Sequence, residues 1–108
     1  MRYSRQVLFE KIGQEGQEKI SKANIAIIGL GATGSNSAEL LARAGIGNLT
    51  LIDRDIIEET NLQRQTLFGE SDISLPKAFV AKEKLEKINS KIKIKACFKD
   101  INYKNIEF

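Results

Sequence analysis

One stretch of the chain, residues 24–53, restricts the fold more than any other, because it carries an apolar run, a glycine-rich turn and an acidic residue in a set order. The run Ile25-Ala26-Ile27-Ile28 is short and largely β-branched, which predicts a strand buried on both faces. Glycines follow at once, at Gly29, Gly31 and Gly34. This order predicts that the chain leaves the strand through a tight turn.

A helix and a second strand follow the glycine turn. Small and apolar residues recur three or four positions apart at Ala38, Leu41, Ala42 and Gly45, which is the spacing of a helix face. The glycine at the end of this run stops the helix. Residues 49–53 then form a second strand, and its last residue is Asp53.

The order of strand, glycine turn, helix, strand and acid is typical of a nucleotide site. Glycines let the backbone approach a phosphate closely, and the N–H groups and dipole of the helix N-terminus attract its negative charge. Asp53 follows Gly34 at the spacing of about 20 residues at which a carboxylate commonly accepts hydrogen bonds from ribose hydroxyls. The pattern favours nucleotide binding over a ligand-free turn, and it does not distinguish NAD, FAD and ATP.

The last third of the chain predicts one more helix and one more strand. Residues 77–89 form the helix, with Pro76 suited to its start and a buried stripe at Ala78, Ala81, Leu85 and Ile88. Residues 90–99 alternate between apolar side chains and lysines, which predicts a strand at a sheet edge with one solvent-exposed face. We therefore expect a Rossmann-like α/β fold, with a mostly parallel three-stranded sheet flanked by helices and connected by right-handed crossovers.

The two ends of the chain carry weaker signals. Residues 1–23 predict an N-terminal arm packed by Tyr3, Leu8 and Phe9, followed by a short polar helix over residues 13–23 that is anchored mainly by Ile20. We expect residues 24–108 to form the nucleotide-binding segment. Residues 100–108 look like the beginning of another helix, so we expect this segment to be an incomplete part of a larger domain.

The loop beyond the second strand, residues 54–65, holds candidate phosphate ligands. Asn61 and Arg64 are three positions apart, so on a helical turn they would share a face and could clamp a phosphate, although a surface loop with an ordinary salt bridge fits equally well. Lys77 would stand at a helix start, where a cation is unfavourable, and this favours a phosphate-binding role. Cys97 has no partner base, so we interpret it as incidental rather than as a nucleophile.

Composition excludes several function classes. The chain has no histidine, which excludes histidine catalysis and histidine metal ligation, and its single cysteine excludes an intrachain disulfide and a four-thiolate zinc site. No apolar run has the length of a membrane span, and the polar N-terminus does not resemble a signal peptide, so we expect a cytoplasmic protein with no membrane partner. The lysines near the C-terminus lack interleaved aromatic residues, so they indicate a solvated face and no nucleic-acid partner.

The chain resembles the N-terminal part of the ThiF/MoeB family, the bacterial relatives of ubiquitin-activating enzymes. An arginine-tyrosine arm and an Asn-Leu-Gln-Arg-Gln stretch carry this resemblance with more specificity than the glycines do, and neither belongs to the ordinary dehydrogenase pattern. The matching stretches run in order along nearly the whole chain: Arg2-Tyr3-Ser4-Arg5-Gln6, Gly16-Gln17, Ile27-Ile28-Gly29-Leu30-Gly31-Ala32-Thr33-Gly34-Ser35, Ala44-Gly45-Ile46-Gly47, Asp53-Arg54-Asp55, Asn61-Leu62-Gln63-Arg64-Gln65 and Pro76-Lys77-Ala78.

The resemblance implies an ATP- and Mg²⁺-dependent adenylyltransferase. Such an enzyme activates the C-terminal glycine carboxylate of a ubiquitin-like sulfur-carrier protein ending in Gly-Gly as an acyl-adenylate, for thiamine or molybdopterin biosynthesis. It works as a homodimer, in which Arg5 would reach the nucleotide of the neighbouring protomer. The implied catalytic residues are Arg5, Arg64 and Lys77, and the implied nucleotide ligands are Gly29, Gly31, Ala32, Gly34, Asp53, Asp55, Thr60, Asn61, Leu62, Gln63, Arg64 and Lys77.

Two departures from the family pattern limit what is carried over. Ala32 stands where the family usually has the second glycine of a pair, and alanine is strained there if the position requires a positive φ. The family's magnesium-binding aspartate and carrier-docking loop lie further downstream, so we expect this chain to hold most of the ATP-contacting side chains only. Two alternatives stay open: a non-catalytic nucleotide-binding or dimerisation module, and an NAD-dependent oxidoreductase.

Overall fold

Three parallel strands form the centre of the chain, and the computed structural model describes residues 1–106. The strands are β1 (Asn24–Ile28), β2 (Asn48–Asp53) and β3 (Lys93–Phe98), arranged in the order β1-β2-β3. Ile27 of β1 pairs with Leu51 of β2, which pairs with Ala96 of β3. This arrangement confirms the predicted Rossmann-like sheet, with the apolar run of β2 at its centre.

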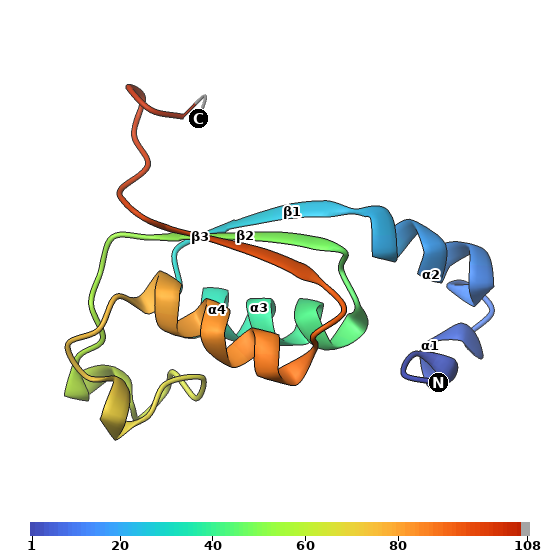
Figure 1. Ribbon diagram of the computed structural model, residues 1–108, viewed down its shortest axis with the longest axis horizontal. Coiled ribbons are helices and arrows are strands. Elements are labelled where there is room, and N and C mark those ends of the chain that lie inside the picture. The colour runs from blue at the N-terminus through green and yellow to red at the C-terminus, as the bar shows by residue number, and fades with distance from the viewer. Residues whose placement is uncertain (107–108) are drawn as a thin grey trace.

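Two helices cover one face of this sheet. α3 (Ala32–Ala44) connects β1 to β2, and α4 (Lys77–Ile88) lies between β2 and β3 along the chain. Both lie on the same side of the sheet (Figure 1). The predicted helical stripes face the core: Ala38, Ala42, Ala78, Ala81 and Leu85 are fully buried, and Leu41 and Ile88 pack against them. None of the helices formed by residues 1–106 combines the length and hydropathy of a membrane span.

β1 is not buried on both faces, and this prediction was wrong. Ile25 and Ile27 pack against the core, whereas Ala26 is exposed and Ile28 is 63% exposed. The reason is that β1 lies at a sheet edge and that the described helices cover only one face. A continuous apolar run predicts a strand but does not show which neighbours cover it.

β3 has the predicted alternation and lies at the other sheet edge. Ile94 is buried toward the helices, while Lys93 and Lys95 are exposed on the opposite face. Phe98 is 47% exposed, but its ring meets Phe79 of α4 edge to face, with centroids 6.0 Å apart. These contacts fix α4 against the outer strand.

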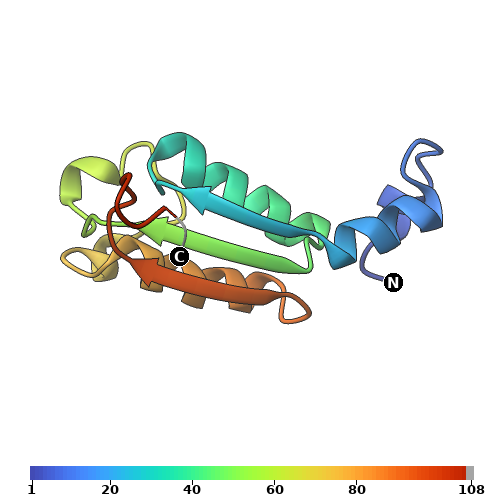
Figure 2. The same ribbon diagram turned by 90° about the horizontal axis from the view of Figure 1, so that it is seen from above.

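The N-terminal arm consists of two helices, α1 (Ser4–Val7) and α2 (Gly13–Lys22), at one end of the sheet (Figures 1 and 2). Tyr3 anchors it as predicted, since its hydroxyl oxygen accepts a 2.9 Å hydrogen bond from Asn89 Nδ2. The prediction for Leu8 and Phe9 was wrong, because they are 76% and 55% exposed.

Polar contacts hold this arm instead of apolar ones. The carbonyl oxygen of Ala44, at the end of α3, accepts hydrogen bonds from Gln6 Nε2 at 3.0 Å and from Gln17 Nε2 at 3.2 Å. Arg2 Nη1 donates to the carbonyl of Ile88, at the end of α4. In α2, Gln17 is buried and Ile20 is half-buried. Gln17 is buried because the last carbonyls of α3 need hydrogen-bond donors from outside that helix.

Gly45 is a sensitive position under this arm. Its φ is +93°, and an added Cβ would lie 2.6 Å from Cζ of Tyr3. We expect Gly45→Ala to lower the free energy of unfolding by about 1–2 kcal/mol, the cost of a left-handed conformation in a residue with a side chain. Urea denaturation measures this change. Gly31→Ala is the matched control, since Gly31 has φ −75° and nothing lies near its Cβ position. An equal loss in both variants would contradict the requirement for glycine at position 45.

A partly buried ion pair joins Asp72, in the short helix before α4, to Lys84 of α4. Asp72 accepts hydrogen bonds from Lys84 Nζ at 2.6 Å and from the Gly69 N–H at 2.8 Å. Burial raises the pKa of Asp72, but the hydrogen bonds from Lys84 and Gly69 and the charges of Lys84 and Lys87 outweigh burial, so its pKa is below the ordinary value.

This pair makes stability depend on acid pH. A carboxyl whose pKa is lower in the folded state stabilises the protein above its unfolded pKa of about 3.9, and this stabilisation is lost as the pH falls through the folded value. We expect Asp72→Asn to reduce stability near neutral pH and to flatten its decline below about pH 4. Thermal unfolding against pH measures this, with Glu83→Gln as the control, because Glu83 forms an exposed pair with Lys87. The same pH profile in Asp72→Asn and in the unmodified protein would contradict it.

Residues 100–106 form turns rather than the predicted helix, and residues 107–108 of that prediction lie outside the described part of the chain. Asn105 Nδ2 donates to the carbonyl of Asp100 at 2.7 Å, and the Asn102 N–H donates to Asn105 Oδ1 at 2.8 Å. These side-chain contacts compete with helical hydrogen bonds. The segment lies over the carboxyl ends of the strands (Figure 2).

Candidate nucleotide-binding site

Asp53 joins the glycine turn to the end of β2. The Leu30 N–H donates to Asp53 Oδ2, and the Asp55 N–H donates to Asp53 Oδ1, both at 2.6 Å. Gly29, with φ +94°, donates its N–H to the carbonyl of Ile52 at 2.8 Å. Asp53 is 8% exposed, so its carboxylate is held in place. A carboxylate has about four acceptor sites, which leaves capacity for ribose hydroxyls.

The glycine turn is packed closely under the start of α3. A Cβ on Gly34 would overlap the carbonyl oxygen of Gly29, so only glycine lets the helix approach the turn. Ala32 is the first residue of α3, and Ser74 is the one non-glycine residue with a positive φ among residues 1–106. Alanine at position 32 therefore introduces no backbone strain.

The first turn of α3 is open to an anion. Gly31 precedes the helix, and no side chain caps its N-terminus in the described structure. The free N–H groups and dipole of a helix start attract negative charge. Both α3 and α4 begin at the carboxyl-end edge of the sheet (Figure 1), so any ligand there meets two helix N-termini.

Lys77, the first residue of α4, lies beside this edge. Its N–H donates to the carbonyl of Asp55 at 3.0 Å, and the residue is only 5% exposed. Within residues 1–106, no hydrogen bond or ion pair involves its ammonium group. The residue is buried, but its ammonium nitrogen is not one of the buried unpartnered atoms of residues 1–106, so the charge reaches solvent at a helix N-terminus, where a cation is unfavourable. The position therefore suits a cation that meets an anionic ligand.

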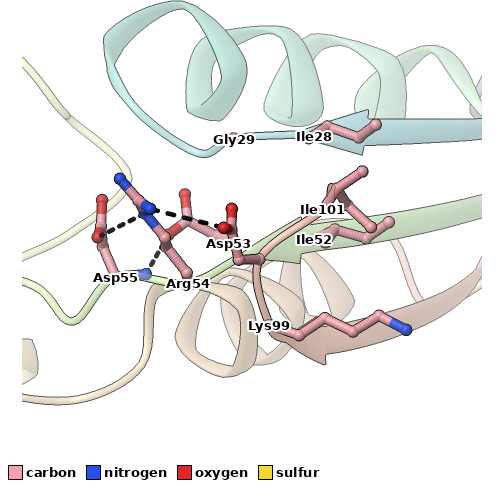
Figure 3. A pocket seen from close by; sticks show the side chains of 9 residues that line it. Ile28, Gly29, Ile52, Asp53, Arg54, Asp55, Lys99 and Ile101 are labelled. Atoms are coloured by element: carbon pink, nitrogen blue, oxygen red, sulfur yellow. Dashed lines mark hydrogen bonds and ion pairs between the residues drawn. The ribbon is translucent and has the colours of Figure 1, made fainter. Parts of the chain in front are cut away.

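A cavity of about 280 Å³ opens at the same edge. Ile28 and Gly29 of the first strand and turn, Ile52 and Asp53 of β2, and Ile101 beyond β3 surround it (Figure 3). It combines apolar walls with a fixed carboxylate. The remaining lining residues are Arg54, Asp55, Lys99 and Asp100.

The loop that follows β2 does not place all predicted ligands in this cavity. Asn61 is buried, and its Oδ1 accepts a 2.9 Å hydrogen bond from the Glu58 N–H, so it holds the short helix of residues 59–61 together. Arg64 is exposed and donates to the carbonyl of Thr60 at 3.0 Å. Neither lines the cavity. Their role as a phosphate clamp stays a prediction.

Leu62 and Gln63 line a different cavity, with Glu59, Glu70 and Ile73. Their predicted contact with the nucleotide also stays a prediction. Arg5 belongs to α1, which lies at the opposite end of the sheet from the glycine turn in both views (Figures 1 and 2). Arg5 therefore lies far from the cavity of its own chain.

The sequence matches the ThiF family over residues 3–108, which is nearly the whole chain. The chain belongs to the ThiF family. It is 47% identical over 107 residues to the sulfur carrier protein ThiS adenylyltransferase of Bacillus subtilis, and 43% identical over 94 residues to the molybdopterin-synthase adenylyltransferase of Haemophilus influenzae. These alignments cover 97% and 87% of this chain, but only 32% and 39% of the relatives.

Solved structures have the same fold. The crystal structure of Escherichia coli MccB with ATP matches with a TM-score of 0.87 and 40% identity, over 94% of this ThiF chain and 31% of that one. A structure named TcdA (CsdL) matches with a TM-score of 0.91 and 31% identity, over 97% of this chain and 41% of that one. The chain thus spans between 31% and 41% of the length of these relatives.

Part of the cavity wall in this ThiF chain comes from residues that the sequence pattern does not predict at the site. Lys99, Asp100 and Ile101 line the cavity, although the sequence predicts Lys99 as the end of a strand and Asp100 and Ile101 as the start of a helix. A signal was available, because residues that follow a third parallel strand reach the same carboxyl-end edge as Gly29 and Asp53. Arg54 was noted only as part of a matching motif, and it too lines the cavity.

Proposed function

We propose that this chain is the ATP-binding part of an adenylyltransferase that activates the C-terminal carboxylate of a ubiquitin-like sulfur-carrier protein as an acyl-adenylate. The observation that carries the proposal is Lys77: its side-chain stem is buried and its backbone N–H donates to the cavity residue Asp55, while its solvent-accessible ammonium has no counter-charge among residues 1–106. The triphosphate of ATP supplies the missing negative charge. The adenylyltransferase relatives and the ATP complex of MccB support the choice of ATP over NAD.

In this proposal the nucleotide spans the carboxyl-end edge of the sheet. The nucleoside occupies the cavity, with its ribose hydroxyls at Asp53, and the phosphates extend from the turn at Gly29 to the open N-terminus of α3. Lys77 and Arg64 then neutralise charge that develops on the leaving pyrophosphate. The attacking carboxylate is already ionised, so the reaction needs no general base, and the lack of histidine in the chain is no obstacle.

Magnesium enters this scheme with the substrate, as MgATP. Residues 1–106 contain no group of three or more metal-binding His, Cys, Asp or Glu side chains. Mg²⁺ commonly keeps several waters and binds through one or two carboxylates plus substrate phosphates, which is compatible with this donor set. The protein's share of the chemistry here is to bind and orient the phosphates.

The proposal includes a second copy of the chain. Arg5 is exposed on α1, away from its own cavity, while Arg2, Tyr3 and Gln6 around it are bound to the ends of α3 and α4. A rigid arm with a free arginine is suited to reach the nucleotide of a neighbouring protomer. This geometry supports a homodimer in which Arg5 acts across the interface.

Exchange of labelled pyrophosphate into ATP tests the proposed reaction in the protein that carries this chain. Exchange is expected only when a carrier ending in Gly-Gly is supplied, because the adenylate forms on the carrier carboxylate. A carrier without its last glycine is the matched control. Exchange without any carrier, or none with every candidate carrier, would contradict the proposal. Binding of NAD in place of ATP would do so as well.

A further inference from the structure

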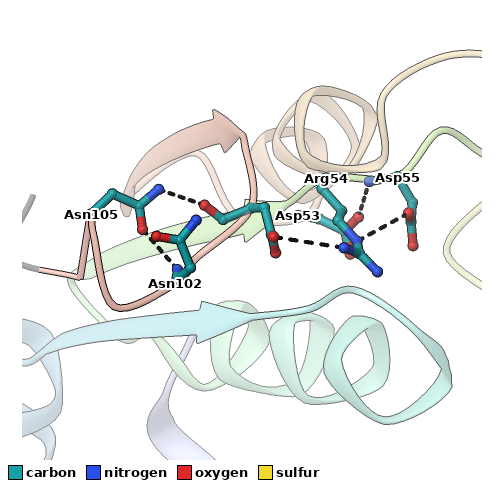
Figure 4. Close-up of polar contacts among 6 residues, drawn as sticks. Asp53, Arg54, Asp55, Asn102 and Asn105 are labelled. Carbon is teal, nitrogen blue, oxygen red and sulfur yellow. Dashed lines mark hydrogen bonds and ion pairs between the residues drawn. The ribbon is translucent and has the colours of Figure 1, made fainter.

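Arg54 lies at the mouth of the cavity and connects two of its walls. Its Nε is 3.9 Å from Asp55 Oδ1, and its Nη1 is 3.6 Å from Asp100 Oδ2. Asp100 belongs to the segment after β3, whose turn is held by Asn102 and Asn105 (Figure 4). The guanidinium therefore lies between the loop after β2 and the loop after β3.

This ion-pair network contributes little to stability. The side chains of Arg54, Asp55 and Asp100 are 68%, 60% and 56% exposed, and exposed pairs of this kind are weak. Both carboxylates approach nitrogen atoms at the edge of the guanidinium. The Arg54 side chain is largely exposed, and no aromatic ring of residues 1–106 packs on its flat faces. Two carboxylates at the edge hold the plane in one orientation.

Charge around the cavity indicates which part of a nucleotide this plane would meet. Three carboxylates, of Asp53, Asp55 and Asp100, face two cations, Arg54 and Lys99. An excess of negative charge disfavours a polyphosphate and tolerates a neutral nucleoside. The apolar side chains of Ile28, Ile52 and Ile101 line the same space, as a flat aromatic base requires (Figure 3).

We propose that Arg54 stacks on the base of the bound nucleotide, with Asp55 and Asp100 holding its plane, and that it thereby favours ligands with a planar aromatic base. This inference rests on the proposed function, since it adds a contact to the same nucleotide site. Guanidinium planes stack well on nucleobases, and an ammonium does not replace a stacked arginine. Arg54 is thus a base-contacting residue and not a phosphate ligand.

Two ligands and three variants test this role by titration calorimetry with magnesium. The ligands are ATP and ribose 5-triphosphate, which has the same phosphates and no base. Arg54→Ala and Arg54→Lys are both expected to weaken ATP binding by about 5- to 150-fold, the range for one base–aromatic stacking contact, and to leave ribose 5-triphosphate binding unchanged. Arg43→Ala is the control for charge, because Arg43 is an exposed arginine of α3 that pairs with Glu39.

Each outcome decides the proposal. Recovery of ATP affinity in Arg54→Lys would show that charge alone is sufficient and would overturn stacking. Equal weakening of ATP and ribose 5-triphosphate in Arg54→Ala would assign Arg54 to the phosphates, and unchanged ATP affinity would remove it from the site. If the unmodified, folded protein binds no ATP, the proposed function itself fails. Circular dichroism of each variant shows that the fold is kept.

Discussion

Lys77→Met is expected to lower the rate of carrier-dependent pyrophosphate exchange by about 100- to 1,000-fold, the usual effect of removing one group that stabilises transition-state charge. The physical reason is that Lys77, on a buried side-chain stem, supplies a positive charge beside the cavity, at a helix start where this charge is unfavourable without a ligand. The methionine keeps the length and apolar character of the side chain. The lost rate therefore reports the charge and not the packing.

The same variant is expected to be at least as stable as the unmodified protein. Removing an unpaired positive charge from a helix start relieves an unfavourable interaction with the helix dipole, so the thermal midpoint stays the same or rises. Lys87→Met is the matched control, because Lys87 lies on the same helix, is 76% exposed at its side chain and pairs with Glu83. Unchanged exchange in Lys77→Met would remove this lysine from the reaction. A fall in the thermal midpoint would show that its charge has a partner in the protein.

Gly34→Ala has the second large expected effect, and it acts on stability and binding together. Its Cβ would overlap the carbonyl oxygen of Gly29, a backbone atom of the turn. The clash forces α3 away from β1, and overpacking of this kind costs about 1–3 kcal/mol of unfolding free energy. The displaced turn also moves the N–H groups that would meet phosphate. ATP affinity is therefore expected to fall even under conditions where the variant is fully folded.

Gly47→Ala separates these two effects. A Cβ on Gly47 would overlap the carbonyl oxygen of Ser21, so the backbone clash is of the same kind, but it lies between α2 and the start of β2. Denaturation in urea should give similar losses for both variants, whereas ATP titration should separate them. A Gly47→Ala variant that loses ATP affinity as much as Gly34→Ala does would contradict a local role for the turn.

The periodic parts of the sequence predicted the fold well. The spacing of Ala78, Ala81 and Leu85 and the alternation along β3 reflect contacts within each element, and the structure has both as expected. The sequence could not predict that one face of β1 is exposed, because this depends on which face of the sheet the helices cover. The arm shows the same limit. Leu8 and Phe9 are apolar but exposed, because the arm is held by polar side chains, such as Gln6, that donate hydrogen bonds to carbonyls at the end of α3.

The sequence predicted where the candidate site lies better than it predicted which residues line it. The order of glycine turn, helix and acid placed Gly29 and Asp53 at one edge, where the structure has them joined through the Leu30 N–H. The two backbone hydrogen bonds that Asp53 accepts come from a turn geometry that residue spacing does not describe. Ile101 was missed because local patterns suggested a helix, while the wall forms from the meeting of three strand ends.

α3 runs from the glycine turn at one end of the sheet to the N-terminal arm at the other. It has 13 residues, so it is about 20 Å long, and a helix of that length bends little. One end carries the glycine turn, and the other carries Ala42 and Ala44, whose carbonyls bind Asn89 of the α4 end and the amides of the arm. A displacement of the arm would therefore be transmitted along α3 to its N-terminus, where the candidate phosphate site lies. If the proposed homodimer forms through the arm, contact between protomers and binding of a ligand at the glycine turn would act on the two ends of the same helix.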